Sequence, residues 1–379
     1  MSVDINDRIT LAHGDGGLKS RELVSDLFLK YFTGEPLRAL TDSAILAQAE
    51  ATIAFTTDAF VISPLFFPGG DIGKLSVTGT VNDLAVMGAT PRYISASFIL
   101  EEGFPVSDLK RIVASMAKTA GEAGVEVVTG DTKVVRKGEA DGIFIVTSGL
   151  GFFRKGRTPL MPSLIRPGDL VLINGYVGDH GVAVLSSREG ITLTTPVSSD
   201  CMPLSDLIES VLETCPSGSV RCMRDPTRGG LATVVNELAE ASNLEIVLDE
   251  QSIPIREEVR AACDIFGLDP LYLANEGKVV AVVDSKWAEA AVGAMRSIPG
   301  GEEARIIGEV RECTGCGGPG SERCGRTDER SEKGRTDLNR NETALAPARP
   351  GKGRALLRLA IGGTRILRTL SGSELPRIC

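Results

Sequence analysis

Short aliphatic segments alternate with longer amphipathic stretches along most of this chain, and this alternation restricts the possible folds more than any other feature. The aliphatic segments include TIAFTTD, EVVTGD, DGIFIVTSG, DLVLING, LEIVLD and KVVAVVD. Such short runs are typical of buried strands, whereas the stretches between them have the spacing of helices packed on a sheet. The sequence therefore predicts an α/β protein with mixed sheets.

Two of the amphipathic stretches predict helices in detail. The first begins at Ser107, whose hydroxyl can cap free backbone amides. Its apolar residues recur at three- and four-residue spacing, which predicts one buried stripe. They are Leu109, Ile112, Val113, Met116 and Ala120. The second helix is expected across GTVNDLAVMG.

A Pro- and Gly-rich basic stretch divides the chain into two domains. The segment RKGRTPLMPSLIRPGD lies between two strand-like runs and has the composition of a linker. We place the boundary near residue 155, which gives domains at 1–155 and 156–312.

The segment from Cys313 to Arg354 differs from the rest of the chain. Its 42 residues contain nine Lys or Arg, six Asp or Glu, and only Leu338 and Leu345 as large apolar residues. Such a segment cannot bury enough surface to offset its ordering entropy, so 313–354 is expected to be a disordered insertion. In residues 355–379, ALLRLAI and TRILRTL flank a Gly pair, which predicts a hairpin followed by a flexible tail.

Composition excludes several classes of function. The 379 residues include 41 Lys and Arg against 50 Asp and Glu, a formal charge of −9, which argues against nucleic acid as a partner. No apolar run approaches the roughly 20 residues needed to span a bilayer, and the N-terminus has no export signal, so a cytoplasmic, membrane-free protein is expected. With His13 and His180 as the only histidines, a multi-histidine metal centre is excluded.

Two predicted strands end in acidic residues. Asp58 follows one of them, and Asp131 follows another, with Lys133 two positions further on. Asn82 and Asp83 lie in the second predicted helix. Ligands of α/β sheets collect beyond strand ends, and carboxylates suit a hard cation, so the set predicts Mg²⁺ with a nucleotide. Taken singly, each Asp is more often a turn cap.

Two glycine-rich segments, HGDGG and DPTRGGL, could hold phosphates. Glycine permits backbone turns that present amides to an anion, and the second segment also opens an apolar-periodic helix beside an arginine. A mobile loop and a close-packed helix start are the structural alternatives. The candidate residues are Asp15, Gly16, Gly17, Arg228, Gly229 and Gly230.

Two more residues are candidates for catalysis. Glu276, in ANEGK before an aliphatic strand, could act as a general base, with a solvated turn as the alternative. Cys379 is the last residue, so its thiol could enter and leave a site.

Of two weaker motifs, GDHG at 178–181 is expected to be a turn. The C-x2-C-x7-C cluster at 313–324 lacks a fourth zinc ligand.

Taken together, these segments make the chain similar to the HypE family of hydrogenase maturation proteins. The matching segments are AHGDGG, TTDAFVISPLFFPGGDIGKL, GTVNDLAVMGATPRY, FILEEG, TGDTKVV, GDHG, DPTRGG, ANEGK and the terminal PRIC. They lie within residues 11–310 and 355–379. The terminal PRIC is the specific part, since the wider superfamily of aminoimidazole ribonucleotide synthetase and selenophosphate synthetase lacks it.

The resemblance implies a homodimer of two-domain, PurM-like subunits that bind ATP and whose N-terminal sheets meet across the dimer. It further implies that HypF delivers a carbamoyl group to Cys379 and that ATP drives its dehydration to a thiocyanate. A HypC–HypD complex would then receive the cyanide on iron for a nickel-iron hydrogenase. The insertion at 313–354 departs from the family pattern.

The residues fit this chemistry independently of the resemblance. An amide oxygen leaves poorly unless it is first converted to a phosphate ester, and phosphoryl transfer needs charge neutralisation. We therefore expect Asp58, Asp83 and Asp131 to organise Mg²⁺ and phosphate, Lys133 to stabilise the transferring group, and Glu276 to remove the nitrogen protons.

Two other functions stay open. A small-molecule kinase or synthetase of the same superfamily would keep its turnover without Cys379. A non-enzymatic metal-binding scaffold would instead depend on the thiols of Cys313, Cys316 and Cys324.

Overall fold

The computed structural model describes residues 18–25, 40–47, 52–190, 196–313, 353–370 and 378. Most of the expected disordered insertion therefore lies outside the described residues. Within the described part of the chain, no helix is both long and apolar enough to cross a membrane.

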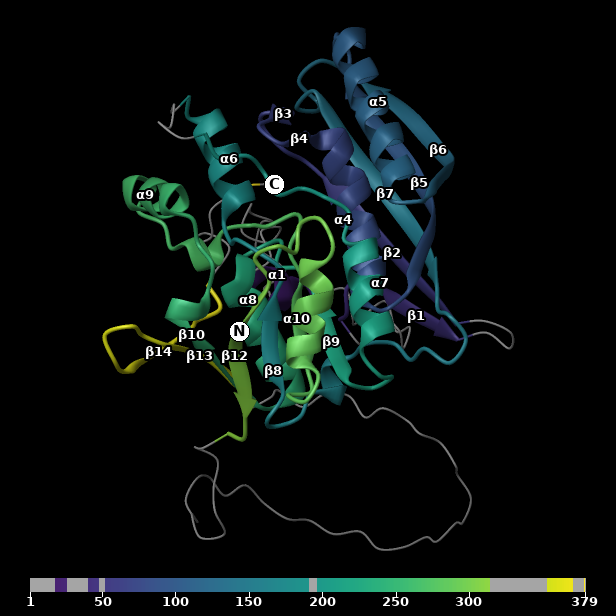
Figure 1. Ribbon diagram of the computed structural model, residues 1–379. Coiled ribbons are helices and arrows are strands. Elements are labelled where there is room, and N and C mark those ends of the chain that lie inside the picture. The colour runs from purple at the N-terminus through teal and green to yellow at the C-terminus, as the bar shows by residue number, and fades with distance from the viewer. Residues whose placement is uncertain are drawn as a thin grey trace, which may run out of the picture.

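The N-terminal half forms a five-stranded sheet covered by helices on one face (Figure 1). Its strand order is β1 (Ala44–Ala47), β2 (Thr52–Phe60), β7 (Ile143–Phe152), β5 (Thr90–Glu101) and β6 (Glu126–Val135). Neighbouring strands are antiparallel except for β5 and β6. Side chains of β7 alternate between buried and half-buried, as expected for a sheet covered on one face only.

Helices α4 (Ile72–Val86) and α5 (Val106–Glu122) cover this sheet. Asp71 caps α4 by accepting hydrogen bonds from two backbone amides, and the helix is buried on nearly every side. The predicted start of α5 is wrong: the helix begins at Val106, one residue before Ser107, and Pro105 occupies the N-cap in place of Ser107, which lies inside the helix. Val113 is 44% exposed, so the predicted stripe is only partly buried.

The C-terminal half forms a seven-stranded sheet with helices on both faces (Figure 1). Its strand order is β14 (Thr364–Ile366), β13 (Arg354–Arg358), β10 (Glu245–Asp249), β12 (Arg305–Arg311), β8 (Leu170–Ile173), β11 (Val280–Val283) and β9 (Val220–Arg224). Helix α8 (Gly230–Ser242) packs in one apolar core, and α7 (Ser205–Thr214) and α10 (Ala288–Arg296) pack in the other. The predicted hairpin is confirmed as β13 and β14, which pair antiparallel.

The remaining elements of the described chain lie outside the two large sheets and the helices already named. They are α1 (Leu18–Leu23), β3 (Phe66–Phe67), β4 (Gly70–Asp71), α6 (Asp179–Arg188), α9 (Glu257–Phe266) and three single 3₁₀ turns, 162–164, 250–252 and 270–272. The predicted turn at GDHG is wrong, because α6 begins at Asp179 after a left-handed Gly178 with φ of 90°. One apolar cluster contains Ile62 and Ile72 of the first half with Val182 and Val259 of the second. The expected two-domain α/β fold with mixed sheets is confirmed.

Candidate functional site

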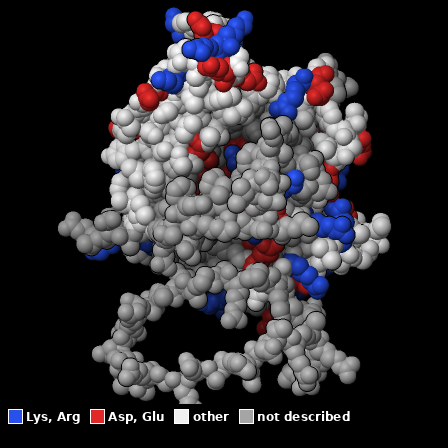
Figure 2. Space-filling view, turned by 180° about the vertical axis from the view of Figure 1, so that it is seen from behind, with Lys and Arg blue, Asp and Glu red and all other residues white. Residues whose placement is uncertain are grey.

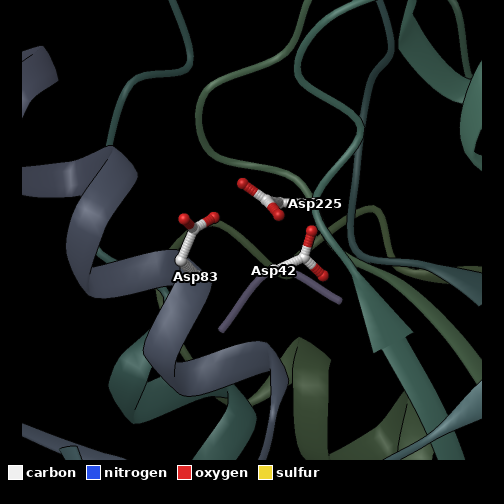
Figure 3. Close-up of side chains that lie close together, drawn as sticks. All are labelled: Asp42, Asp83 and Asp225. Atoms are coloured by element: carbon white, nitrogen blue, oxygen red, sulfur yellow. The ribbon is translucent and has the colours of Figure 1, made fainter. Parts of the chain in front are cut away.

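Three aspartates from distant parts of the sequence converge where the two domains meet. Asp42 precedes β1, Asp83 lies on α4, and Asp225 follows β9, and Figure 3 shows their side chains turned toward one another. One oxygen of each carboxylate lies within 4.8 Å of the others. Asp83 was expected here, whereas sequence reasoning missed Asp42 and Asp225 as site residues.

Strand β2 positions this aspartate cluster. The hydroxyl of Thr56 lies 2.9 Å from Oδ2 of Asp83 and 2.9 Å from the carbonyl oxygen of Asp42. Two residues further along β2, Asp58 points from the same side of the strand and shares a hydrogen bond with Asp83. Asp58 and Asp83 are thus brought together as expected. Asp58 lies within β2, however, and not beyond its end.

Burial and mutual repulsion hold protons on this cluster. Burial raises the pKa of Asp42 to about 6 and that of Asp225 to about 8, and the neighbouring carboxylates add to both shifts. Burial also raises the pKa of Asp58, although Arg228 and the hydrogen bond to Asp83 oppose the shift. Burial and the neighbouring carboxylates raise the pKa of Asp83 well above its ordinary value. Four carboxylates this close cannot all ionise without a compensating positive charge.

These side chains fit a hard divalent cation. Nε of Arg224 lies 2.7 Å from Oδ2 of Asp42, but the two are not aligned for a hydrogen bond. That buried oxygen therefore lacks a hydrogen-bond donor among the described residues. Carboxylate oxygens are the ligands that Mg²⁺ prefers, and a cation would replace the protons that burial retains. The observed oxygens thus match the expected metal, with Asp42 and Asp225 in the set.

Glu276 lies buried close to this cluster. Burial, followed by the charges of Asp225 and Asp200, raises its pKa well above the ordinary value, and the guanidinium of Arg228 opposes the shift. Its backbone is fixed by Asp200, whose two carboxylate oxygens accept hydrogen bonds from the amides of Glu276 and Gly277, at 3.1 and 3.2 Å. A buried carboxyl group with a raised pKa is suited to proton transfer near neutral pH.

A buried ion pair supports that backbone. Nζ of Lys278 lies 3.0 Å from Oδ2 of Asp200, and both side chains are more than nine-tenths buried. Burial alone would raise the pKa of Asp200, but Lys278 and His180 outweigh it and lower the pKa. The ion pair thus keeps Asp200 ionised as an acceptor for the Glu276 loop.

The segment that precedes α8 brings the guanidinium of Arg228 near the aspartate cluster. Gly229 and Gly230 both adopt left-handed backbone conformations, with φ of 72° and 62°. A Cβ atom on Gly230 would lie 2.4 Å from the carbonyl oxygen of Leu273. Arg228, just before them, is exposed but close enough to lower the pKa of Asp58. Figure 2 shows acidic and basic side chains lying together in a hollow of one face of the molecule.

Asn82 is buried next to Asp83 but is occupied by backbone groups. Its Nδ2 donates to the carbonyl oxygens of Met202, at 3.2 Å, and Glu276, at 3.4 Å. Its Oδ1 accepts from the amide of Leu204 at 2.8 Å. Asn82 therefore joins α4 to two segments of the other domain.

Asp131 and Lys133 are not brought to the aspartate cluster within the chain. Both are exposed on β6, the outer strand of the first sheet. Strands β7 and β5 lie between β6 and Asp58 on β2, so three strand spacings, about 14 Å, separate the backbones.

Several expected residues lie outside the described residues. They are Asp15, Gly16, Gly17, Cys316, Cys324 and Cys379. Cys313, the described member of the cysteine cluster, is half-buried.

Comparison with family models matches both halves of the chain. Residues 40–153 match the N-terminal domain of AIR synthase related proteins, and residues 166–317 match the C-terminal domain. The carbamoyl dehydratase HypE of Cupriavidus necator is 47% identical over 373 residues, which cover 98% of this chain and 95% of that protein. The protein of the same name from Escherichia coli is 45% identical over 314 residues, covering 82% and 92%.

Solved structures agree with these matches. A chain in a crystal structure of a HypE–HypF complex is 42% identical with a TM-score of 0.77, covering 92% of this chain and 99% of that one. A hydrogenase maturation protein HypE in complex with ATP is 42% identical with a TM-score of 0.74, covering 98% and 100%.

Proposed function

This chain belongs to the HypE family of carbamoyl dehydratases, which act in hydrogenase maturation, and on that premise we propose that it dehydrates a carbamoyl group carried on its own Cys379. The observation that carries the proposal is the meeting of Asp42, Asp83 and Asp225 with Glu276 where the two domains join. That arrangement joins a cation and phosphate site to a buried proton acceptor.

The proposed reaction consumes one ATP for each carbamoyl group. The carbamoyl oxygen attacks the γ-phosphorus, ADP leaves, and one nitrogen proton is lost, giving an imidate phosphate on sulfur. Loss of the second nitrogen proton then expels inorganic phosphate and leaves S–C≡N. The oxygen atom departs in the phosphate, so the net change is the removal of water.

Some of the described residues would neutralise phosphate charge, and another would accept protons. Asp42, Asp83 and Asp225 would hold Mg²⁺, with Asp58 hydrogen-bonded to Asp83 beside them. When bound, the cation supplies neutralisation of phosphate charge. Arg228 adds a guanidinium near Asp58 and Glu276. Glu276, as a carboxylate that burial makes more basic, would accept the nitrogen protons one at a time.

We also propose that ATP lies at this hollow and that the two glycine-rich segments hold its phosphates. The ATP complex of a 42% identical relative supports this assignment. The chemistry of the segments supports it as well. Glycine backbones such as those of Gly16, Gly17 and Gly229 are suited to present amides to anions, whereas the amide of Gly230 donates to the carbonyl oxygen of Thr227 at 3.1 Å.

A homodimer joined through the N-terminal sheets is part of the proposal. Strand β6 is an exposed edge, and Phe55 and Tyr93 are 40% and 41% exposed on the same sheet. Edge strands and apolar sheet faces of this kind are usually covered in the functional assembly. Asp131 and Lys133 would meet ATP only once β6 is paired, with Lys133 stabilising the transferring phosphoryl group.

We further propose HypF as the donor of the carbamoyl group and a HypC–HypD complex as the acceptor of the cyanide. The solved HypE–HypF complex of a relative supports the first partner. The second partner rests on the resemblance to the family, and the product is compatible with it, because a thiocyanate sulfur can return to thiolate when cyanide leaves to a metal.

Intact-protein mass spectrometry tests the proposal. Incubation with the carbamoyl-donating partner should add one carbamoyl mass to the chain, and MgATP should then remove one water. C379A should gain no mass, whereas E276Q should gain the carbamoyl group and retain it with ATP. Carbamoyl mass that persists on wild-type protein after MgATP would overturn the proposed reaction.

A further inference from the structure

Ile378, the residue before Cys379, is firmly seated in the structure. Its side chain is only 3% exposed and belongs to the apolar cluster that joins the two domains. The same cluster contains Ile62 from the first domain and Val182 and Val184 from α6 of the second. An exposed tail would leave an isoleucine in water, so this placement favours a docked chain end.

Arg188 holds the backbone of the same residue. It lies in the last turn of α6, and its Nη2 donates a hydrogen bond to the carbonyl oxygen of Ile378 at 2.9 Å. Its Nε donates to the carbonyl oxygen of Ser63, in the first domain, at 2.7 Å. One guanidinium therefore connects α6, the other domain and the chain end, which a lysine with a single nitrogen cannot do in the same way.

We propose that Arg188 and the Ile378 seat form a latch that sets how long Cys379 stays at the domain junction. The inference rests on the proposed function, in which the thiol must meet both a partner and the ATP site. Cys379 is bonded directly to Ile378, so its reach is limited while Ile378 is seated. Release requires at least that the buried side chain of Ile378 and its contact with the Arg188 guanidinium be lost.

The latch predicts that Arg188→Met exposes the thiol. We expect alkylation of Cys379 by iodoacetamide, followed as mass gain on the C-terminal peptide, to become about tenfold faster, as for loss of one charge-assisted hydrogen bond. The matched control is R296M, because Arg296 also ends a helix and donates to a backbone carbonyl, that of Ala304, at 2.9 Å. The control should alkylate at the wild-type rate.

Two further variants separate the latch from a general loosening of the fold. I378S changes only the chain end and should accelerate alkylation as R188M does, whereas buried Cys201 should stay unreactive in both. R188K should fall between wild type and R188M. Unchanged alkylation of Cys379 in both R188M and I378S would overturn the latch.

Alkylation requires no ATP, which separates this inference from the proposed reaction. If R188M alkylates faster but wild-type protein never loses water with MgATP, the latch stands and the reaction fails. If wild-type protein does lose water while alkylation ignores Arg188 and Ile378, the reaction stands and the latch fails. With both correct, R188M should accept the carbamoyl group faster and dehydrate it more slowly.

Discussion

At the scale of single residues, the site consists of carboxylates whose ionisation is opposed by their surroundings. Asp58 and Asp83 could be found in the sequence because each lies in a recognisable strand or helix. Asp225 had a weaker signal, its place beside the glycines of DPTRGG, and Asp42 had none. Both meet Asp83 only through the packing of one domain against the other, which no local pattern records.

Removal of one carboxylate should separate cation binding from stability. We expect D83N to lower turnover with MgATP by at least about 100-fold, since ligand loss weakens cation binding. In chelator, the same variant should melt at or above the wild-type temperature, because the asparagine side chain is neutral without binding the proton that the buried carboxyl group of Asp83 must take up on folding. Calorimetric Mg²⁺ titration and thermal melts measure the two effects. Exposed Asp141 provides a control, D141N, which should change neither.

His180 should make stability depend on pH in the acid range. Burial lowers its pKa to about 4 from an ordinary 6.5, so between these values the unfolded chain binds more protons. Stability from this group is therefore complete above pH 6.5 and is lost as pH falls, by about 3 kcal/mol at pH 4. Urea unfolding of H180Q against wild type should show a smaller acid loss in the variant. Parallel curves for the two proteins would contradict this origin.

At the scale of elements, the sequence predicted which segments are helices and strands better than where each begins and ends. The apolar spacing in residues 107–120 fixed the existence of α5, but Pro105 moved its start. Strand β6 was expected to end before Asp131, yet it continues through Lys133, because backbone pairing with β5 extends beyond the aliphatic run. The local pattern of side chains does not indicate how far the backbone of one strand pairs with its neighbour.

The left-handed start of α8 gives a prediction for this element. G230A should destabilise the protein by roughly 2 kcal/mol or more, because its Cβ meets backbone carbonyl oxygens at φ of 62°. G293A, in the middle of α10 with open space around the added Cβ, should be neutral or stabilising by about 0.5–1 kcal/mol. Chemical denaturation of the two variants provides the comparison. Equal effects would show that the close approach is not limiting.

At the scale of the whole molecule, one face of the first sheet stays open in the described structure, whereas helices pack on both faces of the central strands of the second sheet. We expect Y93E to shift the proposed homodimer to monomer and to abolish turnover while the fold is retained. V113E, at a similarly exposed position on α5, should leave the dimer intact. Light scattering after size exclusion reports the mass, and a dimeric Y93E would place the interface elsewhere.

The two ends of the insertion flank one residue of the second sheet. Glu245 pairs with Arg311 of β12 on one side and with Arg354 of β13 on the other, and Nε of Arg354 lies 2.7 Å from the Glu245 carboxylate. The exit and re-entry points are thus about 10 Å apart whatever the length between them. The segment between these two points can therefore be lengthened, shortened or replaced, even by a folded reporter domain, without displacing β13 and β14, the strands that precede the reactive thiol.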